Sequence, residues 1–490
     1  MARKGTPRLD RAEGPIETYI RGPIGPARTL RTMDLHLAVD PRSPLRAQLE
    51  RQLREGIRSG RLRADARLPP SRELARELGV SRGVIVDAYS QLVAEGYLVA
   101  RRGSGTQVAG SIGTEPVIKP SRPPRGPAIR HDLHSGLPDV SSFPRRAWQA
   151  ATATALRDLP DAWLTYGRPR GFSRLRVALA DYLGRARATE STPRQIIICA
   201  GLSHGLTLVW GALRERGARS VAVEDPAWPG QPNSVAHAGL EPVPIPVDES
   251  GLVVAELERA DVDAVIVTPA HQYPTGVVLS PERRGALIEW ARRRGTLVVE
   301  DDYDAEYRYD REPVAALQGL APERVIHAGT TSKTLAPALR LAWLMLPDHL
   351  VDPVTAQHQL TLASPSIVDQ AALAILLERG ELERHLRQMR RRYRARRDAL
   401  VDALAAELPE ARIGGAAAGL HVVAWLPEPA DEGAIKSRAL ERGVAIHTLH
   451  HDSAAVAPVP PALLFGYASL AEPALWRAAR EVAAAVRSAG

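Results

Sequence analysis

The chain has 490 residues, 44% of them hydrophobic and 24% charged, a globular composition long enough for two or three domains. Its single cysteine, Cys199, excludes an intramolecular disulfide and a cysteine-rich zinc site, and no metal centre is expected. No apolar run approaches the roughly 18 residues of a membrane helix, so the sequence indicates a cytoplasmic protein without a membrane partner.

Positive charge is concentrated at the N-terminal end. Residues 1–130 hold 24 Lys and Arg against 13 Asp and Glu, whereas residues 131–490 hold 40 against 43. This asymmetry favours a polyanionic partner for the N-terminal part. Within that part, residues 1–35 are rich in arginine, glycine and proline without a sustained apolar period, and they predict a basic disordered arm.

Three helices are predicted between residues 43 and 94. The first is expected to have Ser43 as its cap and Pro44 at its first position, and it carries apolar residues every four positions, at Leu45, Leu49, Leu53 and Ile57. Ser71 is expected to cap a second, short helix that Gly79 ends, and Ser81 to cap a third. Two short helices joined by a tight Gly-Val-Ser turn are typical of a helix-turn-helix.

A β-hairpin with a basic tip is predicted next, from residues 97–100 and 106–108. The stretch 43–108 resembles the winged helix of GntR-type regulators, through Leu-Pro-Pro-Ser-Arg at 68–72, Leu-Gly-Val-Ser-Arg at 78–82 and Arg-Gly-Ser-Gly-Thr at 102–106. The resemblance implies a DNA-binding domain over 36–108 whose DNA contacts are Arg72, Arg82, Arg102 and Gly103. Whether these arginines read guanine or hold phosphate stays open.

Residues 109–130 contain five prolines and three glycines with little apolar material, and they predict an extended, semi-rigid linker. Beyond it, apolar strands alternate with amphipathic helices, which favours a mainly parallel sheet covered by helices. The predicted strands are Gln195–Ala200, Ser220–Glu224, Ala264–Thr268, Thr296–Glu300 and Arg324–Ala328. A basic helix around Arg387–Arg397 is expected to lead into a smaller subdomain, 395–490.

The stretch Gly329–Arg340 sets one lysine, Lys333, among small hydroxyl residues at the end of a predicted strand. The hydroxyls of Thr330 and Ser332 with the guanidinium of Arg340 would bind a dianionic phosphate. An amine beside a phosphate site is what pyridoxal phosphate requires, because its aldehyde forms a Schiff base with lysine. The stretch resembles the lysine motif of the fold-type I aminotransferases.

Three further motifs support that resemblance. It implies that Asp301 pairs with the pyridine nitrogen, that Tyr303 reaches the cofactor's ring oxygen and that Trp228 stacks on the ring. Gly201–Gly205 opens an apolar helical pattern, so the backbone N–H groups of Leu202 and Ser203 would point at the phosphate.

The family's Tyr-Gly loop is matched by Tyr166–Gly171, and the resemblance implies that Tyr166 reaches the phosphate of the neighbouring subunit, hence a homodimer. Two positions depart from the family. Tyr273 replaces an asparagine that bonds the ring oxygen; His271 or Gln272 either compensates or satisfies loop backbone. Leu464 stands where aminotransferases place an arginine for the substrate carboxylate, which predicts poor transamination of ordinary α-amino acids.

The combination over 36–490 resembles the MocR-type regulators, with the aminotransferase-like domain over 131–490. The resemblance implies a two-domain protein: a winged helix-turn-helix joined to an α/β domain of the aspartate aminotransferase type, with large and small subdomains. It further implies a nucleoid-associated, PLP-dependent transcription factor that binds an operator with repeated half-sites and senses PLP, an amine or an amino acid. Two alternatives are a working aminotransferase with an accessory DNA-binding head, and a DNA-binding protein whose large domain only dimerises.

Overall fold

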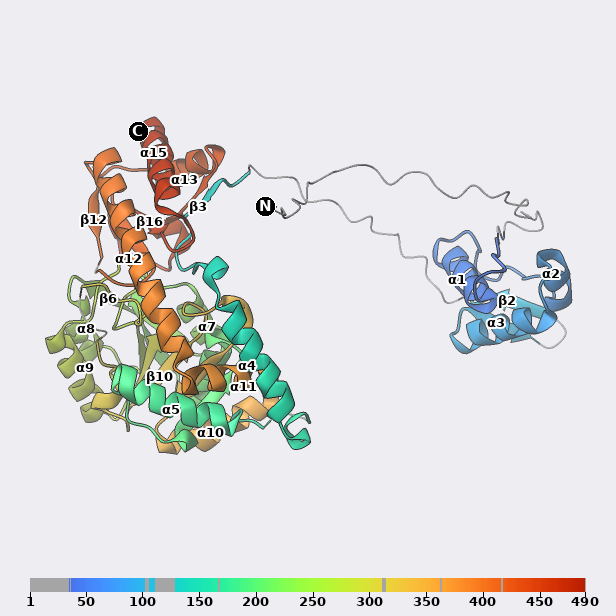
Figure 1. The fold of residues 1–490 in the computed structure, drawn as a ribbon, viewed down its shortest axis with the longest axis horizontal. Helices are drawn as coiled ribbons and strands as arrows, with labels where there is room; N and C mark the ends of the chain where they lie inside the picture. The colour runs from blue at the N-terminus through green and yellow to red at the C-terminus, as the bar shows by residue number, and fades with distance from the viewer. Residues whose placement is uncertain are drawn as a thin grey trace, which may run out of the picture. The chain divides into compact units, whose positions relative to one another are not determined.

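The computed structural model describes residue 35 and residues 37–101, 105–110, 128–165, 168–310, 314–361, 364–415 and 417–489. Nearly all of the predicted N-terminal arm and most of the predicted linker therefore lie outside the described residues, as do Arg102, Gly103 and Tyr166. Two compact units divide the chain between residues 124 and 125 (Figure 1). None of the helices in the described ranges is long and apolar enough to cross a membrane.

The first unit contains three helices and a hairpin: α1 (Leu45–Arg58), α2 (Ser71–Leu78), α3 (Arg82–Ala94), β1 (Leu98–Arg101) and β2 (Gly105–Val108). The two strands pair antiparallel, as predicted. Leu49, Leu53 and Ile57 enter its core as predicted, together with Leu92 of α3, whereas Leu45 is only half-buried and lies outside that core. A helix-turn-helix followed by its wing is thus present in the predicted order.

The helix starts differ in detail from the prediction. The residue immediately before α1 is Pro44, so Ser43 does not cap this helix. Ser71 is the first residue of α2 rather than its cap. Ser81 does occupy the cap position of α3, but its side chain makes no capping hydrogen bond. Gly79 ends α2 in a left-handed conformation with φ of 68°, as expected of a glycine at that place.

The second unit is built on an eight-stranded sheet, in the order β4-β11-β10-β9-β8-β5-β6-β7. Their bounds are β4 (Ile196–Cys199), β5 (Ser220–Asp225), β6 (Glu241–Asp248), β7 (Gly251–Leu252), β8 (Ala264–Val267), β9 (Leu297–Asp302), β10 (Val325–Thr330) and β11 (Ala342–Met345). All five predicted strands are present, and the run from β10 to β6 is parallel. β11 pairs antiparallel with both neighbours, a direction that apolar runs alone do not indicate.

Helices cover both faces of this sheet (Figure 1). They are α4 (Arg145–Asp158), α5 (Ser173–Arg187), α6 (Leu202–Glu215), α7 (Gly230–His237), α8 (Val254–Arg259), α9 (Pro281–Arg294), α10 (Asp348–Thr361) and α11 (Ile367–Glu378). Alternate strand residues enter different cores: Val221 packs with α6 and α10, whereas Ala222 packs with α8 and α9. Cys199 is buried in the first of these cores.

The long helix α12 (Glu381–Glu407) leads into the smaller subdomain, as predicted (Figure 1). That subdomain contains β12 (Arg412–Gly414), β13 (His421–Trp425), α13 (Glu432–Glu441), β14 (Val444–Ala445), β15 (His447–Thr448), α14 (Leu449–Asp452), β16 (Ala462–Gly466) and α15 (Glu472–Ala489). The start of the unit also belongs there, because β3 (His131–Asp132) pairs with β14. The chain therefore passes through the small subdomain before it forms the large one.

A buried ion cluster fixes the end of β9. The carboxylate of Asp302 accepts hydrogen bonds from Arg187 Nε at 2.8 Å and His327 Nε2 at 2.9 Å, and all three side chains are at most 5% exposed. Burial opposes ionisation of Asp302, but the charge of Arg187 and the bond from His327 outweigh it and hold its pKa below the usual range. α5 and β10 are thereby tied to β9.

We expect Asp302→Ala to destabilise the second unit by about 3–5 kcal/mol, because it leaves the buried guanidinium of Arg187 without its counter-charge. Urea unfolding followed by tryptophan fluorescence measures this unit alone, since all eight tryptophans lie beyond residue 124. Asp398→Ala removes an exposed carboxylate that lies 3.3 Å from Arg397 and 4.0 Å from Arg394, and it should cost less than about 1 kcal/mol. Equal midpoints for the two variants would contradict the assignment.

Candidate functional site

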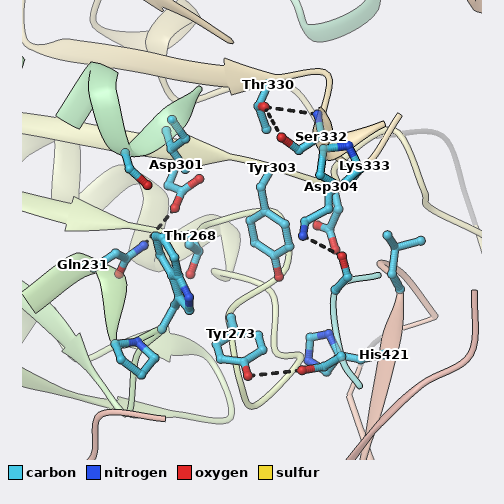
Figure 2. A pocket seen from close by; sticks show the side chains of 18 of the residues that line it. Gln231, Thr268, Tyr273, Asp301, Tyr303, Asp304, Thr330, Ser332, Lys333 and His421 are labelled. Atoms are coloured by element: carbon cyan, nitrogen blue, oxygen red, sulfur yellow. Dashed lines mark hydrogen bonds between the residues drawn. The ribbon is translucent and has the colours of Figure 1, made fainter. Parts of the chain in front are cut away.

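A cavity of about 460 Å³ lies where the carboxyl ends of the central strands meet the small subdomain (Figure 2). Nine of the ten residues predicted to bind the cofactor line it: Leu202, Ser203, Trp228, Asp301, Tyr303, Thr330, Ser332, Lys333 and Arg340. The tenth, Tyr166, lies outside the described residues. A cavity of this volume with convergent polar groups is typical of small-molecule sites.

Lys333 projects into this cavity from the turn that follows β10 (Figure 2). Its Nζ donates a hydrogen bond to the carbonyl oxygen of Gly136 at 2.6 Å. Burial lowers the pKa of the amine, although the charges of Asp304 and Asp301 act in the opposite direction. A buried amine with a lowered pKa is more often neutral, and the neutral form is the nucleophile.

Asp301 is the last but one residue of β9, and its carboxylate is buried in the cavity wall. Oδ2 accepts a hydrogen bond from Gln231 Nε2 at 2.9 Å (Figure 2), whereas Oδ1 has no partner among the described residues. Burial raises the pKa of this carboxyl to about 7. A buried carboxylate oxygen without a donor is a place where an N–H of a ligand would bind.

The other end of the cavity has the character of an anion site. α6 begins there at Leu202, so the unsatisfied N–H groups of its first turn lie at the cavity wall. Arg340 lies beside it and donates to the carbonyl of Ala200 at 2.9 Å. Gly201 makes this approach possible, because a Cβ at that position would overlap the guanidinium. Thr330 and Ser332 add hydroxyls that are 2.9 Å apart.

The two aromatic residues predicted to contact the cofactor differ in their partners. Trp228 is 38% exposed and its indole lies over Gly230, where a Cβ would overlap the ring. Tyr303 is half-buried, and its hydroxyl donates to the carbonyl oxygen of His271 at 2.9 Å. That hydroxyl therefore supports the loop backbone in this structure, while the ring forms part of the cavity wall.

At the first departure from the family, Tyr273 lines the cavity and its hydroxyl lies 3.2 Å from Ser135 Oγ. Gln272 donates to the carbonyls of Pro226 and Tyr273, so it satisfies loop backbone, one of the two roles foreseen for it. His271 is buried against Asp304, 3.0 Å away, and neither His271 nor Gln272 lines the cavity.

The second departure needs a correction. Leu464 does not form the cavity wall opposite the lysine, because it is fully buried in a small apolar cluster with Val423, Leu449 and Ala462. The neighbouring strands instead supply the wall through His421 and His447. A ligand carboxylate would therefore face imidazole rings and not the leucine side chain.

Those two imidazoles are uncharged at neutral pH. Burial, together with a neighbouring histidine in each case, lowers the pKa of His421 to about 3 and that of His447 to about 4. The backbone N–H of Ser135 donates to His447 Nδ1, and the hydroxyl of Ser135 lies 2.7 Å from the same nitrogen. Nδ1 is therefore an acceptor and the proton of His447 is on Nε2.

This wall, called the far wall below, is formed by Ser135, Tyr273, His421 and His447. It therefore carries no positive charge that could bind an anion. Among the described lining residues, Lys333 is the only lysine and Arg340 the only arginine, and both lie toward the predicted cofactor. Asp452 adds a carboxylate at the far end, where Lys436 Nζ neutralises it at 2.6 Å. Sequence reasoning missed this wall because its residues come from short strands without a recognisable motif.

The structure describes two of the four predicted DNA contacts. Arg72 and Arg82 are exposed on α2 and α3, close to the N-terminus of each helix. Arg82 Nε lies 3.5 Å from the hydroxyl of Ser71, so the N-termini of α2 and α3, which carry the two arginines, lie close together. Arg102 and Gly103, in the predicted wing, lie outside the described residues.

Both units match known protein families. The sequence pattern of the bacterial regulatory proteins of the gntR family matches residues 45–108, and that of aminotransferase class I and II matches residues 132–458. Similar solved structures include an archaeal alanine:glyoxylate aminotransferase, with a TM-score of 0.68 and 26% identity over 74% of this chain and 91% of its own. Kynurenine aminotransferase of Pyrococcus horikoshii, in complex with PMP, has a TM-score of 0.66 and 26% identity over 73% and 90%.

Pyridoxal phosphate, the cofactor that this aminotransferase family implies, fits the cavity. The nucleophilic amine of Lys333 and the unpaired oxygen of Asp301 match its aldehyde and its ring nitrogen. Arg340 and the first turn of α6 match its phosphate. The chain therefore has a PLP site in an aminotransferase fold.

Relatives with both units are transcriptional regulators. The HTH-type pyridoxine biosynthesis transcriptional regulator PdxR of Corynebacterium glutamicum is 35% identical over 429 residues, which are 85% of this chain and 91% of that protein. The probable rhizopine catabolism regulatory protein MocR of Rhizobium meliloti is 34% identical over 87% of this chain and 90% of its own. The chain belongs to the MocR-type transcriptional regulators of the GntR family, in which a winged helix-turn-helix is fused to an aminotransferase-like, PLP-binding domain.

Proposed function

We propose that this regulator binds operator DNA through residues 36–108 and that residues 131–490 sense PLP or an amine that reacts with it. The main support for the proposal is the cavity, which brings Lys333 together with the unpaired oxygen of Asp301. Its far wall has no cation. The name of the Corynebacterium relative, a regulator of pyridoxine biosynthesis, supports PLP itself as one effector.

Each residue around the cavity has a proposed role. Lys333 holds the cofactor through a Schiff base, Asp301 bonds its ring nitrogen and Trp228 covers one face of its ring. Leu202, Ser203, Thr330, Ser332 and Arg340 bind its phosphate. Tyr303 and Tyr166 are proposed to reach the ring oxygen and the neighbouring subunit's phosphate. When bound, PLP supplies an aldehyde that exchanges between amines, and this chemistry lets an amine effector alter the site.

The far wall limits the effector's chemistry. Tyr273, Ser135 and the two uncharged histidines offer hydrogen bonds, but no ion pair to a carboxylate. A ligand carboxylate would lose a charge-assisted bond worth roughly 1.5–3 kcal/mol, about one to two decades in affinity. The wall therefore favours PLP itself, or an amine without an α-carboxylate, over an ordinary amino acid.

We propose that the functional unit is a homodimer acting in the cytosol at the nucleoid. Two winged helices on one dimer would recognise repeated half-sites in the operator. An effector shifts such a dimer between two states only by its difference in affinity for them, so binding of effector and of DNA must be reciprocally coupled.

Lys333 is expected to form the Schiff base. Purified protein incubated with PLP should absorb as a protonated Schiff base, and borohydride reduction followed by peptide mapping should place the label on Lys333. Lys333→Ala should be colourless. The matched control is Lys436→Ala, which removes the other lysine of this unit and should keep the label, because Lys436 pairs with Asp452 and does not itself line the cavity. A label on another lysine would refute the role.

DNA binding is expected to depend on Arg72, Arg82 and Arg102. Each arginine that contacts a phosphate should contribute about one unit to the slope of log binding constant against log salt concentration. Each arginine that contacts a base should set specificity at one position of the operator. The triple alanine variant should lose most of its affinity in a titration with labelled operator. Alanine at Arg51, Arg58 and Arg63, exposed in the same unit, makes an equal charge change and should cost far less. Equal losses would contradict the assignment.

Ordinary α-amino acids are expected to convert the cofactor poorly. Spectra recorded with alanine or glutamate should change far more slowly than the turnover of about 10 per second of a typical enzyme. His447→Arg would place a cation on the far wall and should increase amino-acid affinity about tenfold, while retention of PLP verifies that the site is intact. Rapid conversion by the unmodified protein would instead favour a working aminotransferase.

A further inference from the structure

The long helix α12 carries a row of exposed arginines that the cofactor site does not use. Arg384, Arg387, Arg391 and Arg394 are exposed at intervals of three and four residues, so they lie along one face of the helix over about 15 Å. The opposite face is apolar and buried, through Leu382, Leu386, Met389 and Tyr393. The arginine row therefore adds nothing to the core.

The first three arginines of the row line a shallow hollow on the surface of the second unit. It is lined by Arg384, Arg387, Gln388, Arg391 and Arg392, without a carboxylate among the lining residues. It shares no residue with the cofactor cavity. Figure 1 shows α12 running along the outside of this unit, from the large sheet to the small subdomain.

Three of the four arginines in the row also lack internal counter-charges; the fourth, Arg394, lies 4.0 Å from Asp398. In the described ranges, no carboxylate lies within ion-pair distance of Arg384, Arg387 or Arg391, whereas exposed arginines elsewhere in the unit, such as Arg174 and Arg185, have acidic partners within 3.0 Å. Within α12, Arg392 and Arg396 turn inward to the buried Asp139. Like charges three and four residues apart on a helix repel each other, so the row has an energetic cost that an external anion would offset.

We propose that this arginine hollow binds the phosphate backbone of duplex DNA that flanks the operator. Arginine is the residue best suited to phosphate, because its planar guanidinium donates two parallel hydrogen bonds. A row of this length matches two or three successive phosphates of one strand. The proposal rests on operator binding by the first unit: once that unit is bound, the second contact is intramolecular and benefits from a high effective concentration of DNA.

The hollow would act without reading sequence. Phosphate contacts fix position and add affinity, and they carry no direct information about the bases. The contribution should therefore require DNA beyond the operator but tolerate any sequence there. It should also depend steeply on salt, since each neutralised phosphate releases a counterion.

The test compares the full chain with its Arg384→Gln, Arg387→Gln, Arg391→Gln variant on two DNA fragments, one limited to the operator and one extended by random flanks. Unmodified protein should bind the long fragment more tightly and with the steeper salt slope. The variant should bind both fragments equally, with its slope on the long fragment reduced by about two to three units. Glutamine keeps helix propensity and hydrogen bonding, so an unchanged unfolding midpoint verifies the fold.

The matched control is Arg477→Gln, Arg480→Gln, Arg487→Gln, which removes three exposed charges from α15 in the same unit. It should leave the preference for the long fragment intact. An equal loss in this control, or an unchanged preference in the α12 variant, would overturn the proposal. So would a change in oligomeric state on sedimentation, which would assign the face to another copy of the chain. Loss of binding to the short fragment by the unmodified protein would instead contradict operator binding itself.

Discussion

The site depends on two adjacent buried carboxylates at the end of β9 that have different partners. Asp301 and Asp302 are adjacent on β9 and their side chains point to opposite faces of the sheet. Asp302 receives a guanidinium and an imidazole, and it is held ionised as part of the framework. Asp301 receives a single neutral donor, Gln231, and burial raises its pKa to about 7. One carboxylate thus stabilises the fold, while its neighbour remains available to a ligand.

The elements predicted with most success were those with local signals. Lys333, Asp301, Trp228 and Arg340 stand in motifs at strand ends, and parallel strands bring their carboxyl ends to one edge, so their convergence followed from topology. Gly79 correctly predicted the end of α2, because glycine adopts the left-handed conformation found there without strain. The serine caps were predicted less well: Ser71 is the first residue of α2, and Ser81 occupies the cap position of α3 without a capping bond.

Residues of the far wall could not be predicted, because they meet only through long-range pairing. His447 and His421 are more than twenty residues apart and lie on strands that flank β16. Ser135 precedes them by about three hundred residues. The expectation for Leu464 failed for a related reason: a motif identifies a position along a strand, but the direction of its side chain depends on the register with both neighbours. A ligand carboxylate still has no cationic partner on this wall, because histidines form it in place of the leucine and burial keeps them uncharged.

The hydrogen bond between Lys333 and Gly136 has a mechanical consequence. Gly136 lies four residues beyond β3, the strand that pairs with β14 and is the first element after the connection to the DNA-binding unit. A free ammonium has three protons to donate, whereas a lysine nitrogen engaged in a Schiff base has at most one. Occupancy of the cavity therefore competes for the donor that anchors this stretch of backbone. Chemistry at a single nitrogen would in this way change how firmly the backbone beside β3 is held, without a change in the rest of the fold.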